Sequence, residues 1–362
     1  MPKIDALLDD LVKRGGTVLH LGAGHPPLAR IRGELVPMRE GLVDAAELEE
    51  VLFELLTPAQ SAQLQANLDL ELAYGYRDVA RFRASYFRKS TGLAAVFRLV
   101  PIRVLTLAEL GCPEVLWRLA DRRAGLVLVT GPTDAGKSTT LAAMLDHINK
   151  TRACHILTIE EPLEFVHEPL RAQVTHREVG NHVSSFATAL RGAARENPDV
   201  VLVGALLSNE TMKLALQLAS QGILVFGTLP TNGVIATIDR LIGAFPKDEQ
   251  PQVRGMLAES LVGIVSQQLL RTSDGKGRVA VHEILVGSAA VSGMIREAKT
   301  TQLTNVMQAG HAAGMQTMDM GLERLLTQGR ISAEDALLRA VDREQFAQII
   351  ARLRPDLAEN LG

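Results

Sequence analysis

The stretch that most constrains this chain is residues 131–138, which read Gly-Pro-Thr-Asp-Ala-Gly-Lys-Ser and fit the pattern G-x-x-x-x-G-K-[ST]. The apolar run before it, residues 125–130, predicts a buried strand, and residues 138–149 after it predict a helix. A glycine-rich loop between a strand and a helix is the context in which this pattern forms a phosphate-binding loop, or P-loop. The sequence therefore predicts a nucleotide-binding fold. The alternative is a glycine-rich turn that Ser138 caps.

The chemistry of a P-loop follows from its backbone. Successive N–H groups and the N-terminus of the following helix form a nest for phosphate oxygens. Lys137 would reach the β- and γ-phosphates, and the Ser138 hydroxyl would hold Mg²⁺. ATP and Mg²⁺ are therefore the expected ligands, and whether the chain hydrolyses ATP is a separate question.

Composition excludes several classes of function. A net charge of −3 and a pI near 6.3 argue against a dedicated binder of nucleic acid or of anionic membranes. The two cysteines, Cys112 and Cys154, cannot complete a four-ligand zinc site and are expected as buried thiols in a reducing cytosol. The first residues lack the apolar stretch of a signal peptide, and no run of 18 apolar residues occurs. We therefore expect a cytoplasmic protein that reaches a membrane only through a partner.

The first hundred residues predict a small α+β domain. Helices are expected at residues 4–12 and 45–56. Strands are expected at residues 18–21, 28–32, 35–38, 68–73, 79–86 and 94–100, the second and third forming a hairpin around Gly33-Glu34. This N-terminal domain is assigned to residues 1–100 and a linker to residues 101–107.

Beyond the linker, a helix at residues 108–121 precedes a region in which apolar strands and helices alternate. The strands are residues 126–130, 155–159, 200–203 and 223–228, and the helices are residues 138–149, 184–195 and 210–220. Such alternation predicts an α/β fold of parallel strands with crossover helices. Two more strands, residues 263–270 and 278–286, close a nucleotide-binding domain at residues 108–287. Helices near residues 288–298, 301–309, 317–328 and 332–340 form a C-terminal helical region, residues 288–362.

Segments along nearly the whole chain, in matching order, resemble the PilT-type retraction ATPases of type IV pili, within the wider type II/IV secretion ATPases. Besides the P-loop, they are residues 19–21 (LHL), 26–27 (PP), 80–83 (ARFR), 95–98 (AVFR), 156–167 (ILTIEEPLEFVH), 177–179 (REV), 198–204 (PDVVLVG), 224–229 (LVFGTL) and 314–319 (GMQTMD). The chain lacks the paired C-x-x-C zinc elements common in pilus-extension and type II secretion ATPases. It therefore resembles the retraction branch more closely.

The resemblance implies a PAS-like N-terminal domain, a RecA-like ATPase domain with C-terminal helices, and a ring-shaped hexamer. Such a ring works on the cytoplasmic side of the inner membrane, at the pilus platform protein, and pulls pilin subunits out of the fibre. The partners implied are further copies of this chain or an active retraction ATPase in a mixed hexamer. Nucleic acid is not among the expected partners.

Several departures from the family pattern fall on positions that the family uses for catalysis. The Walker B strand of the family ends in Gly-Glu, and here Ala205 replaces that glutamate. A methyl group can neither accept a proton nor order water, and loss of a positioned base typically costs about 10² to 10⁴ in rate. Leu207 replaces an arginine and Ser208 an acidic residue. Ile223 and Pro230 replace the two histidines of the family's histidine box.

The P-loop itself carries Asp134 where the family usually has glycine. Aspartate tolerates left-handed backbone geometry better than most residues. Its carboxylate would lie near the phosphates, and two unit charges about 6 Å apart repel by at most roughly 3 kcal/mol at an effective dielectric of about 20. Weak nucleotide binding is therefore expected.

Other positions of the implied site are retained. The resemblance assigns catalytic roles to acidic-box residues and to arginines that stabilise phosphate charge across a subunit boundary: Glu160, Glu164, Arg81, Arg83 and Arg195. It assigns nucleotide contacts to Gly131, Thr133, Gly136, Lys137, Ser138 and Thr139, with Ser138 also on the metal. Arg191 and Arg195 are expected on one helix face, and Glu210 keeps the acidic residue after Walker B.

Could a retained carboxylate replace the missing one? Glu160 follows a strand expected beside the P-loop strand, so Glu160 or Glu164 could support slow hydrolysis. Asp199 begins the strand that Ala205 ends, roughly 20 Å away at about 3.3 Å per residue, and cannot help. His167 and His176 are expected on the solvated surface.

Two hypotheses remain. The first is an active retraction motor, favoured by the P-loop, the acidic box and the arginines. The second is a nucleotide-binding paralogue with impaired hydrolysis and a regulatory or structural role, favoured by Ala205, Leu207, Ile223 and Pro230. A related secretion or conjugation system is a further possibility.

Overall fold

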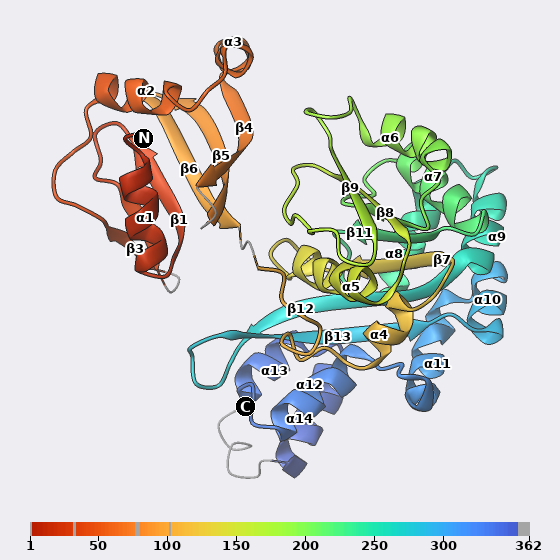
Figure 1. The fold of residues 1–362 in the computed structure, drawn as a ribbon. Coiled ribbons are helices and arrows are strands. Elements are labelled where there is room, and N and C mark those ends of the chain that lie inside the picture. Colours follow the sequence, from red (N-terminus) through yellow and green to blue (C-terminus); the bar gives the residue numbers. More distant parts are fainter. Residues whose placement is uncertain (1, 32–33, 77–79, 101–102, 354–362) are drawn as a thin grey trace. The chain divides into compact units, whose positions relative to one another are not determined.

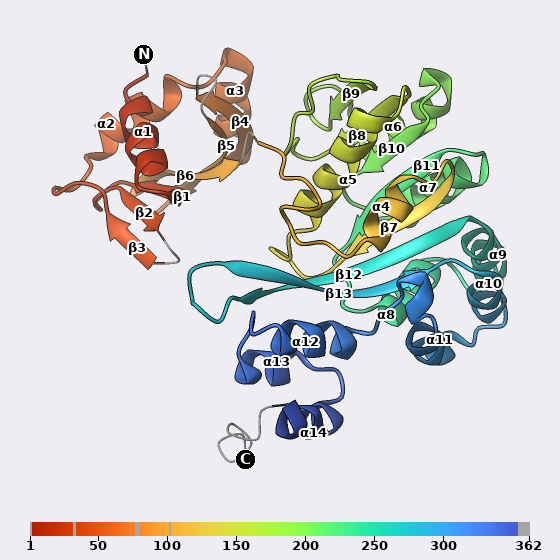
Figure 2. The same cartoon turned by 60° about the horizontal axis from the view of Figure 1, so that its bottom comes forward.

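The computed structural model describes residues 2–31, 34–76, 80–100 and 103–353, and it divides into two compact units. One unit is Met1–Arg103 with Pro162–Val166, and the other is Val104–Glu161 with His167–Gly362. Each unit has a sheet of its own (Figures 1 and 2). Four predicted features fall partly outside the described residues: the hairpin turn at Gly33, the strand start at Val79, linker residues 101–102 and the end of the C-terminal region, residues 354–362.

The first unit is built on a six-stranded antiparallel sheet of order β3-β2-β1-β6-β5-β4. The strands are β1 (Gly16–Gly22), β2 (Leu28–Ile31), β3 (Glu34–Pro37), β4 (Asp69–Tyr76), β5 (Ala80–Lys89) and β6 (Gly92–Val100). Side chains alternate along β5, so Phe82 and Tyr86 are buried while Arg81 and Arg83 lie on the other face. The buried face packs with α1 (Asp5–Lys13), α2 (Ala45–Phe53) and α3 (Pro58–Asn67). The predicted α+β unit is thus confirmed, although α3 was not predicted.

The second unit is built on a seven-stranded sheet of order β13-β12-β7-β11-β10-β8-β9. The strands are β7 (Gly125–Thr130), β8 (His155–Glu160), β9 (Gln173–Glu178), β10 (Val200–Val203), β11 (Leu224–Leu229), β12 (Leu261–Arg271) and β13 (Arg278–Val286). All neighbours are parallel except β12 and β13. Every residue of β7, β10 and β11 is buried, because helices cover both faces of a parallel sheet. The predicted α/β class is confirmed.

Helices of the second unit form two layers and a C-terminal group. They are α4 (Val115–Ala120), α5 (Lys137–Thr151), α6 (Phe186–Ala193), α7 (Asn209–Ser220), α8 (Val234–Gly243), α9 (Gln250–Ser260), α10 (Ala289–Arg296), α11 (Leu303–Ala309), α12 (Met318–Thr327), α13 (Ala333–Arg339) and α14 (Arg343–Leu353). Leu126 and Leu128 of β7 pack with α7 and α9, whereas Val127 and Val129 pack with α4 and α5.

The prediction of one helix over residues 108–121 is wrong. Only α4 is helical there, because Gly111 adopts φ 65° and Pro113 lacks the N–H that an α-helix needs. Predictions missed β9, α8, α9 and α14. The start of α3 did carry a sequence signal: Thr57, Pro58 and Gln60 form a capping box with proline in the first turn.

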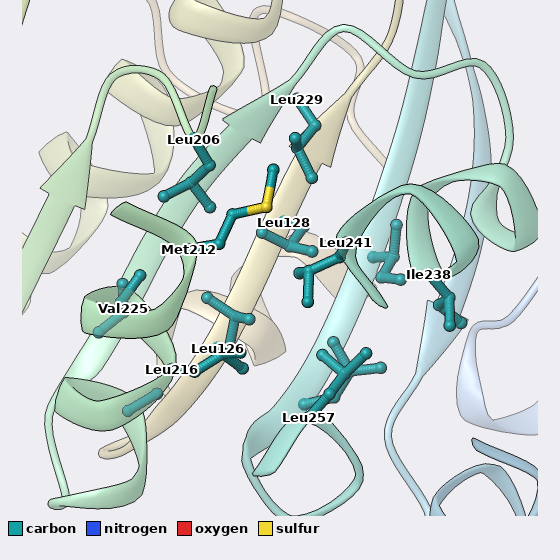
Figure 3. Close-up of a cluster of buried hydrophobic side chains, with 14 of the residues drawn as sticks. Leu126, Leu128, Leu206, Met212, Leu216, Val225, Leu229, Ile238, Leu241 and Leu257 are labelled. Atoms are coloured by element: carbon teal, nitrogen blue, oxygen red, sulfur yellow. The ribbon is translucent and has the colours of Figure 1, made fainter. Parts of the chain in front are cut away.

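Leu128 lies at the centre of the apolar cluster shown in Figure 3 and is fully buried. We expect Leu128→Ala to lower the free energy of unfolding of this unit by about 2–5 kcal/mol, because the deletion leaves a cavity among packed side chains. Urea denaturation followed by circular dichroism measures the effect. Leu207→Ala is the matched control, since Leu207 is 66% exposed, and it should cost no more than about 0.5 kcal/mol. Equal losses for the two variants would contradict this packing.

Candidate functional site

The P-loop connects the end of β7 to the start of α5, at the edge of the sheet where the parallel strands have their carboxyl ends. Helix α5 begins at Lys137 after Gly136, whose φ of 84° is in the left-handed region that glycine tolerates. No side chain caps this helix, and the N-terminus of an α-helix favours an anion. The predicted strand-loop-helix context of the motif is present.

Lys137 points back onto the loop. Its Nζ donates to the carbonyl oxygens of Gly131 at 2.9 Å and Pro132 at 2.7 Å. These contacts hold the ammonium group against the backbone of the loop, and phosphate oxygens would replace the carbonyls as its partners. Ser138 and Thr139 lie half-buried in the first turn of α5, and Thr133 is exposed in the loop.

Asp134 is exposed and adopts φ 63°, a left-handed conformation that aspartate tolerates better than most residues. The backbone therefore keeps the turn for which the family usually has glycine. The substitution changes the loop by adding a carboxylate to its rim.

The residues of this loop fit a magnesium nucleotide. A lysine ammonium, the Ser138 hydroxyl and the uncapped start of α5 are the donor set that binds phosphate and its metal in P-loop proteins. Hard oxygen ligands such as Ser138 Oγ suit Mg²⁺. A bound Mg²⁺ would neutralise charge that develops on the phosphates.

Ala205 lies just beyond β10, at the same edge of the sheet, and β11 separates β10 from β7. The Thr228 hydroxyl donates to the carbonyl oxygen of Gly204, which fixes the backbone before Ala205. Leu207 is exposed, and the Ser208 side chain accepts from Thr211 N at 3.2 Å to cap α7. Serine caps a helix as well as aspartate does, so losing the carboxylate at residue 208 leaves the helix start intact.

Glu160 ends β8, and the prediction that β8 lies beside the P-loop strand is wrong. Strands β11 and β10 lie between β8 and β7, so Glu160 does not follow a neighbour of the P-loop strand. At about 4.8 Å per strand, β8 and β7 are roughly 14 Å apart. Glu160 instead lies directly beside Gly204: a Cβ on Gly204 would be 3.3 Å from Glu160 Cα, and Gly204 N donates to Ile159 O at 2.8 Å. A buried carboxylate therefore adjoins the position where the family's Walker B glutamate is missing.

Pro230 and Ile223 lie at opposite ends of β11. Pro230 follows Leu229, whose carbonyl oxygen accepts from Gly131 N at 3.3 Å, so Pro230 adjoins the P-loop. Ile223 precedes the strand, and its carbonyl accepts from Gly125 N at the start of β7. Within one chain, Ile223 is therefore at the opposite edge of the sheet from the P-loop. The histidine that it replaces would not lie at the same site as Ala205.

The predicted arginine pair on one helix face is also corrected. Helix α6 ends at Ala193, and Arg195 lies in a 3₁₀ turn, Ala194–Glu196, that leads to the amino end of β10. Arg195 is exposed at the edge opposite the P-loop within this chain. Arg191 forms an ion pair with Glu210, the acidic residue retained after Walker B.

Arg81, Arg83 and Glu164 belong to the first unit. Arg81 is exposed on β5, and Arg83 forms an ion pair with Glu71 of β4 at 2.6 Å. Glu164 is half-buried in the segment Pro162–Val166. The acidic box is thus divided between the units, because Glu160 belongs to the second. Roles for these residues stay predictions.

The expectation that His167 and His176 are solvated is wrong. His167 is buried, and its ring stacks on His176 with centroids 6.1 Å apart. Its backbone N–H donates to His176 Nε2 at 3.1 Å, while His176 Nδ1 lies 2.8 Å from Thr158 Oγ1. Burial and the neighbouring His176 lower the pKa of His167 to about 4, so its ring is neutral at pH 7. Pairing of β8 with β9, which was not predicted, brings these residues together.

Sequence reasoning also missed Gln267, a buried residue of β12 whose amide nitrogen donates to the P-loop carbonyl of Ala135 at 2.6 Å. No local signal could have found it, since 132 positions separate the two residues. Only the pairing of β12 with β7 places them side by side. Among the helices of the described residues, none has both the length and the apolar composition needed to cross a membrane.

The chain is similar to known proteins over most of its length. A family model described as type II/IV secretion system protein matches residues 60–338. The chain is 46% identical over 321 residues to a twitching motility protein of Neisseria gonorrhoeae, covering 89% of this chain and 86% of the relative. It is 44% identical over 343 residues to the type IV pilus retraction ATPase PilT of Pseudomonas aeruginosa, covering 95% and 99%. The crystal structure of the pilus retraction motor PilT with bound ADP superposes with a TM-score of 0.88 at 39% identity, covering 95% and 98%.

Proposed function

We propose that this chain, a PilT-like member of the type II/IV secretion system protein family, binds ATP with Mg²⁺ but hydrolyses it slowly. In this proposal it is an accessory or regulatory subunit of a type IV pilus retraction machine. The P-loop residues Gly131, Thr133, Gly136, Lys137, Ser138 and Thr139 hold the phosphates, and Ser138 also contacts the metal.

One observation carries the proposal: a well-formed P-loop faces a strand end that lacks its carboxylate. Lys137 Nζ is held on the loop carbonyls of Gly131 and Pro132, which supports phosphate binding there. At the same edge, Ala205 supplies only a methyl group where a base must orient water. Nucleotide binding is therefore expected without fast ATP hydrolysis, because binding depends on the P-loop and hydrolysis depends on the missing carboxylate.

Parallel measurements on one sample test this proposal. Calorimetry with ADP and Mg²⁺ is expected to give saturable binding with one nucleotide per chain. Phosphate release from ATP is expected at no more than about a hundredth of the typical enzyme rate of about 10 s⁻¹. Turnover near that typical rate would refute impaired hydrolysis, and absence of binding would refute the nucleotide site itself.

Asp134 is expected to weaken binding, so Asp134→Gly should tighten ADP about 3- to 10-fold. Glycine suits the φ of 63°, and the change removes an exposed charge near the phosphates, where solvent screens part of the repulsion. Calorimetry at low and high salt measures the gain, which should shrink as the Debye length falls from about 30 Å at 0.01 M to about 8 Å at 0.15 M. Asp134→Asn, which removes only the charge, should give most of the gain. Unchanged affinity in both variants would rule out this repulsion.

An active motor is the second candidate, and the position of Glu160 favours it. This buried carboxylate lies beside Gly204, next to the vacant Walker B position, and it could act as the base instead. In that case Glu160→Gln should lower ATP turnover at least about a hundredfold. The exposed Glu168→Gln is the control and should leave turnover unchanged. Turnover that survives Glu160→Gln would exclude Glu160 as the base.

We further propose that the chain assembles into a homo-hexamer, or into a mixed hexamer with an active retraction ATPase. In such a ring Arg81, Arg83 and Arg195 would reach the site of a neighbouring subunit. The ring would lie on the cytoplasmic side, at the inner-membrane platform protein of the pilus. Native mass spectrometry of the chain alone, and mixed with an active retraction ATPase, distinguishes the two assemblies by mass.

A further inference from the structure

Gln267 lies where the sheet meets the P-loop. Strand β12 runs parallel to β7, with Ser266 opposite Thr130, the last residue before the loop. Gln267 is therefore the first β12 residue beyond that pair. It is 2% exposed, so its amide must find its partners inside the protein.

The amide of Gln267 contacts both the loop and the helix that follows it. Its Nε2 donates to the carbonyl oxygen of Ala135 at 2.6 Å, and its Oε1 accepts from Thr140 Oγ1 of α5 at 2.8 Å. A backbone carbonyl can only accept, so the NH₂ group must face Ala135 and the oxygen must face Thr140. One side chain thus holds the loop and the first turns of α5 together.

His282 reinforces that orientation from the other side. It is opposite Gln267 in the register of β12 with β13, and its Nε2 lies 3.2 Å from Gln267 Oε1. Burial lowers the pKa of His282 to about 4, so the ring is neutral at pH 7. Because Oε1 can only accept, the ring proton is on Nε2, and Nδ1 has no partner among the described residues.

The loop packs tightly against Gln267 at two glycines. A Cβ on Gly131 would lie 2.2 Å from the backbone oxygen of Gln267, and a Cβ on Gly136 would lie 2.8 Å from its Nε2. Contact with the Gln267 backbone therefore requires glycine at residue 131, and a Cβ at residue 136 would displace the Gln267 amide. The backbone of the loop is shaped against β12.

The bond to Ala135 has a consequence for phosphate. In a planar trans peptide the C=O and the next N–H point in opposite directions. With its oxygen on the Gln267 amide, the Ala135–Gly136 peptide turns the Gly136 N–H away from that amide. Backbone N–H groups of a P-loop are the donors that hold phosphate, so the direction of the Gly136 N–H determines how well the loop binds an anion.

We propose that Gln267 is a positioning residue for nucleotide phosphate: its buried amide orients the Gly136 N–H toward the phosphates, and His282 keeps the amide in that orientation. The proposal rests on the nucleotide binding proposed above. It adds a residue outside the P-loop motif that determines how well the loop donates to an anion.

Gln267→Met keeps the volume and removes the hydrogen bonds. It is expected to weaken ADP and inorganic pyrophosphate about 10- to 100-fold, the effect of losing one well-aligned donor to a charged oxygen. Affinity for adenosine, which has no phosphate, is expected to stay within about twofold of the unmodified chain, because misplacing one phosphate donor is felt only by ligands that carry phosphate. Competition against a fluorescent ADP measures all three. General damage to the site would lower adenosine and ADP affinities together and would overturn the proposal.

Gln268→Met is the matched control, since Gln268 is the next residue of β12 on the other face, and its ADP affinity should not change. If Gln267→Met does not fold, His282→Leu serves instead and should weaken ADP about 3- to 10-fold by releasing one of the contacts that hold the amide. A folded variant of Gln267 or His282 with unchanged ADP affinity would overturn the positioning role. An unmodified chain that binds neither ADP nor pyrophosphate would refute the nucleotide site, and this inference with it.

Discussion

Lys137→Ala is expected to weaken ADP and ATP binding about a hundredfold or more. Lys137 carries the one full positive charge among residues 131–138, and bonds of 2.9 and 2.7 Å to Gly131 O and Pro132 O hold its ammonium group on the loop. Charge-assisted bonds to phosphate contribute about 1.5–3 kcal/mol each, and two of them correspond to at least a hundredfold in affinity. Calorimetry with ADP and Mg²⁺ measures the loss.

Lys150→Ala is the control for that experiment. Lys150 lies on the same helix, α5, but its Nζ is paired with Asp146 at 2.6 Å and its side chain is 48% exposed. Asp146 is buried, so loss of this pair affects the stability of α5, but the pair lies more than three helical turns from the loop and cannot contact the phosphates. Equal losses of ADP affinity in the two variants would show that binding does not depend on the P-loop.

Ala205→Glu is expected to raise ATP turnover about 10²- to 10⁴-fold. The substitution returns a carboxylate to the end of β10, at the edge of the sheet where the P-loop lies. A positioned base contributes a factor of this size to proton transfer from the attacking water. Steady-state phosphate release, with ADP affinity measured beside it, separates faster chemistry from tighter binding.

Ala205→Gln is the control, because an amide has the same shape and cannot accept the proton. It should leave turnover within about tenfold of the unmodified chain, well below the effect of a base. If Ala205→Glu binds ATP but turns over no faster, the missing carboxylate is not what limits hydrolysis.

The parts of the fold that local sequence patterns specify were predictable. Strands β7, β10 and β11 are continuous apolar runs, the pattern of strands buried on both faces, and they lie within one residue of their predicted bounds. The P-loop was predictable because its motif needs only the strand before it and the helix after it. In the first unit, alternation along β5 predicted which side chains are buried.

The other parts of the fold and of the site depend on pairing between segments far apart in the sequence, which local hydrophobic periodicity does not indicate. Glu160 was expected next to the P-loop strand, but the order β7-β11-β10-β8 places it beside Gly204 instead. His176 meets Thr158 only through the pairing of β9 with β8. Arg195 was expected one helical turn from Arg191, and the helix ends between them. A sequence pattern identifies these residues but not their neighbours.

The most direct test of slow hydrolysis by an intact nucleotide site is a single-turnover experiment. The protein, in excess over ATP and with Mg²⁺, is quenched in acid at intervals, and the bound nucleotide is identified. The expected result is that the unmodified chain retains ATP for at least about a hundred times the 0.1 s that a typical turnover takes, while Ala205→Glu converts it to ADP. Conversion by the unmodified chain within about a second, abolished by Lys137→Ala, would contradict impaired hydrolysis and identify an active motor.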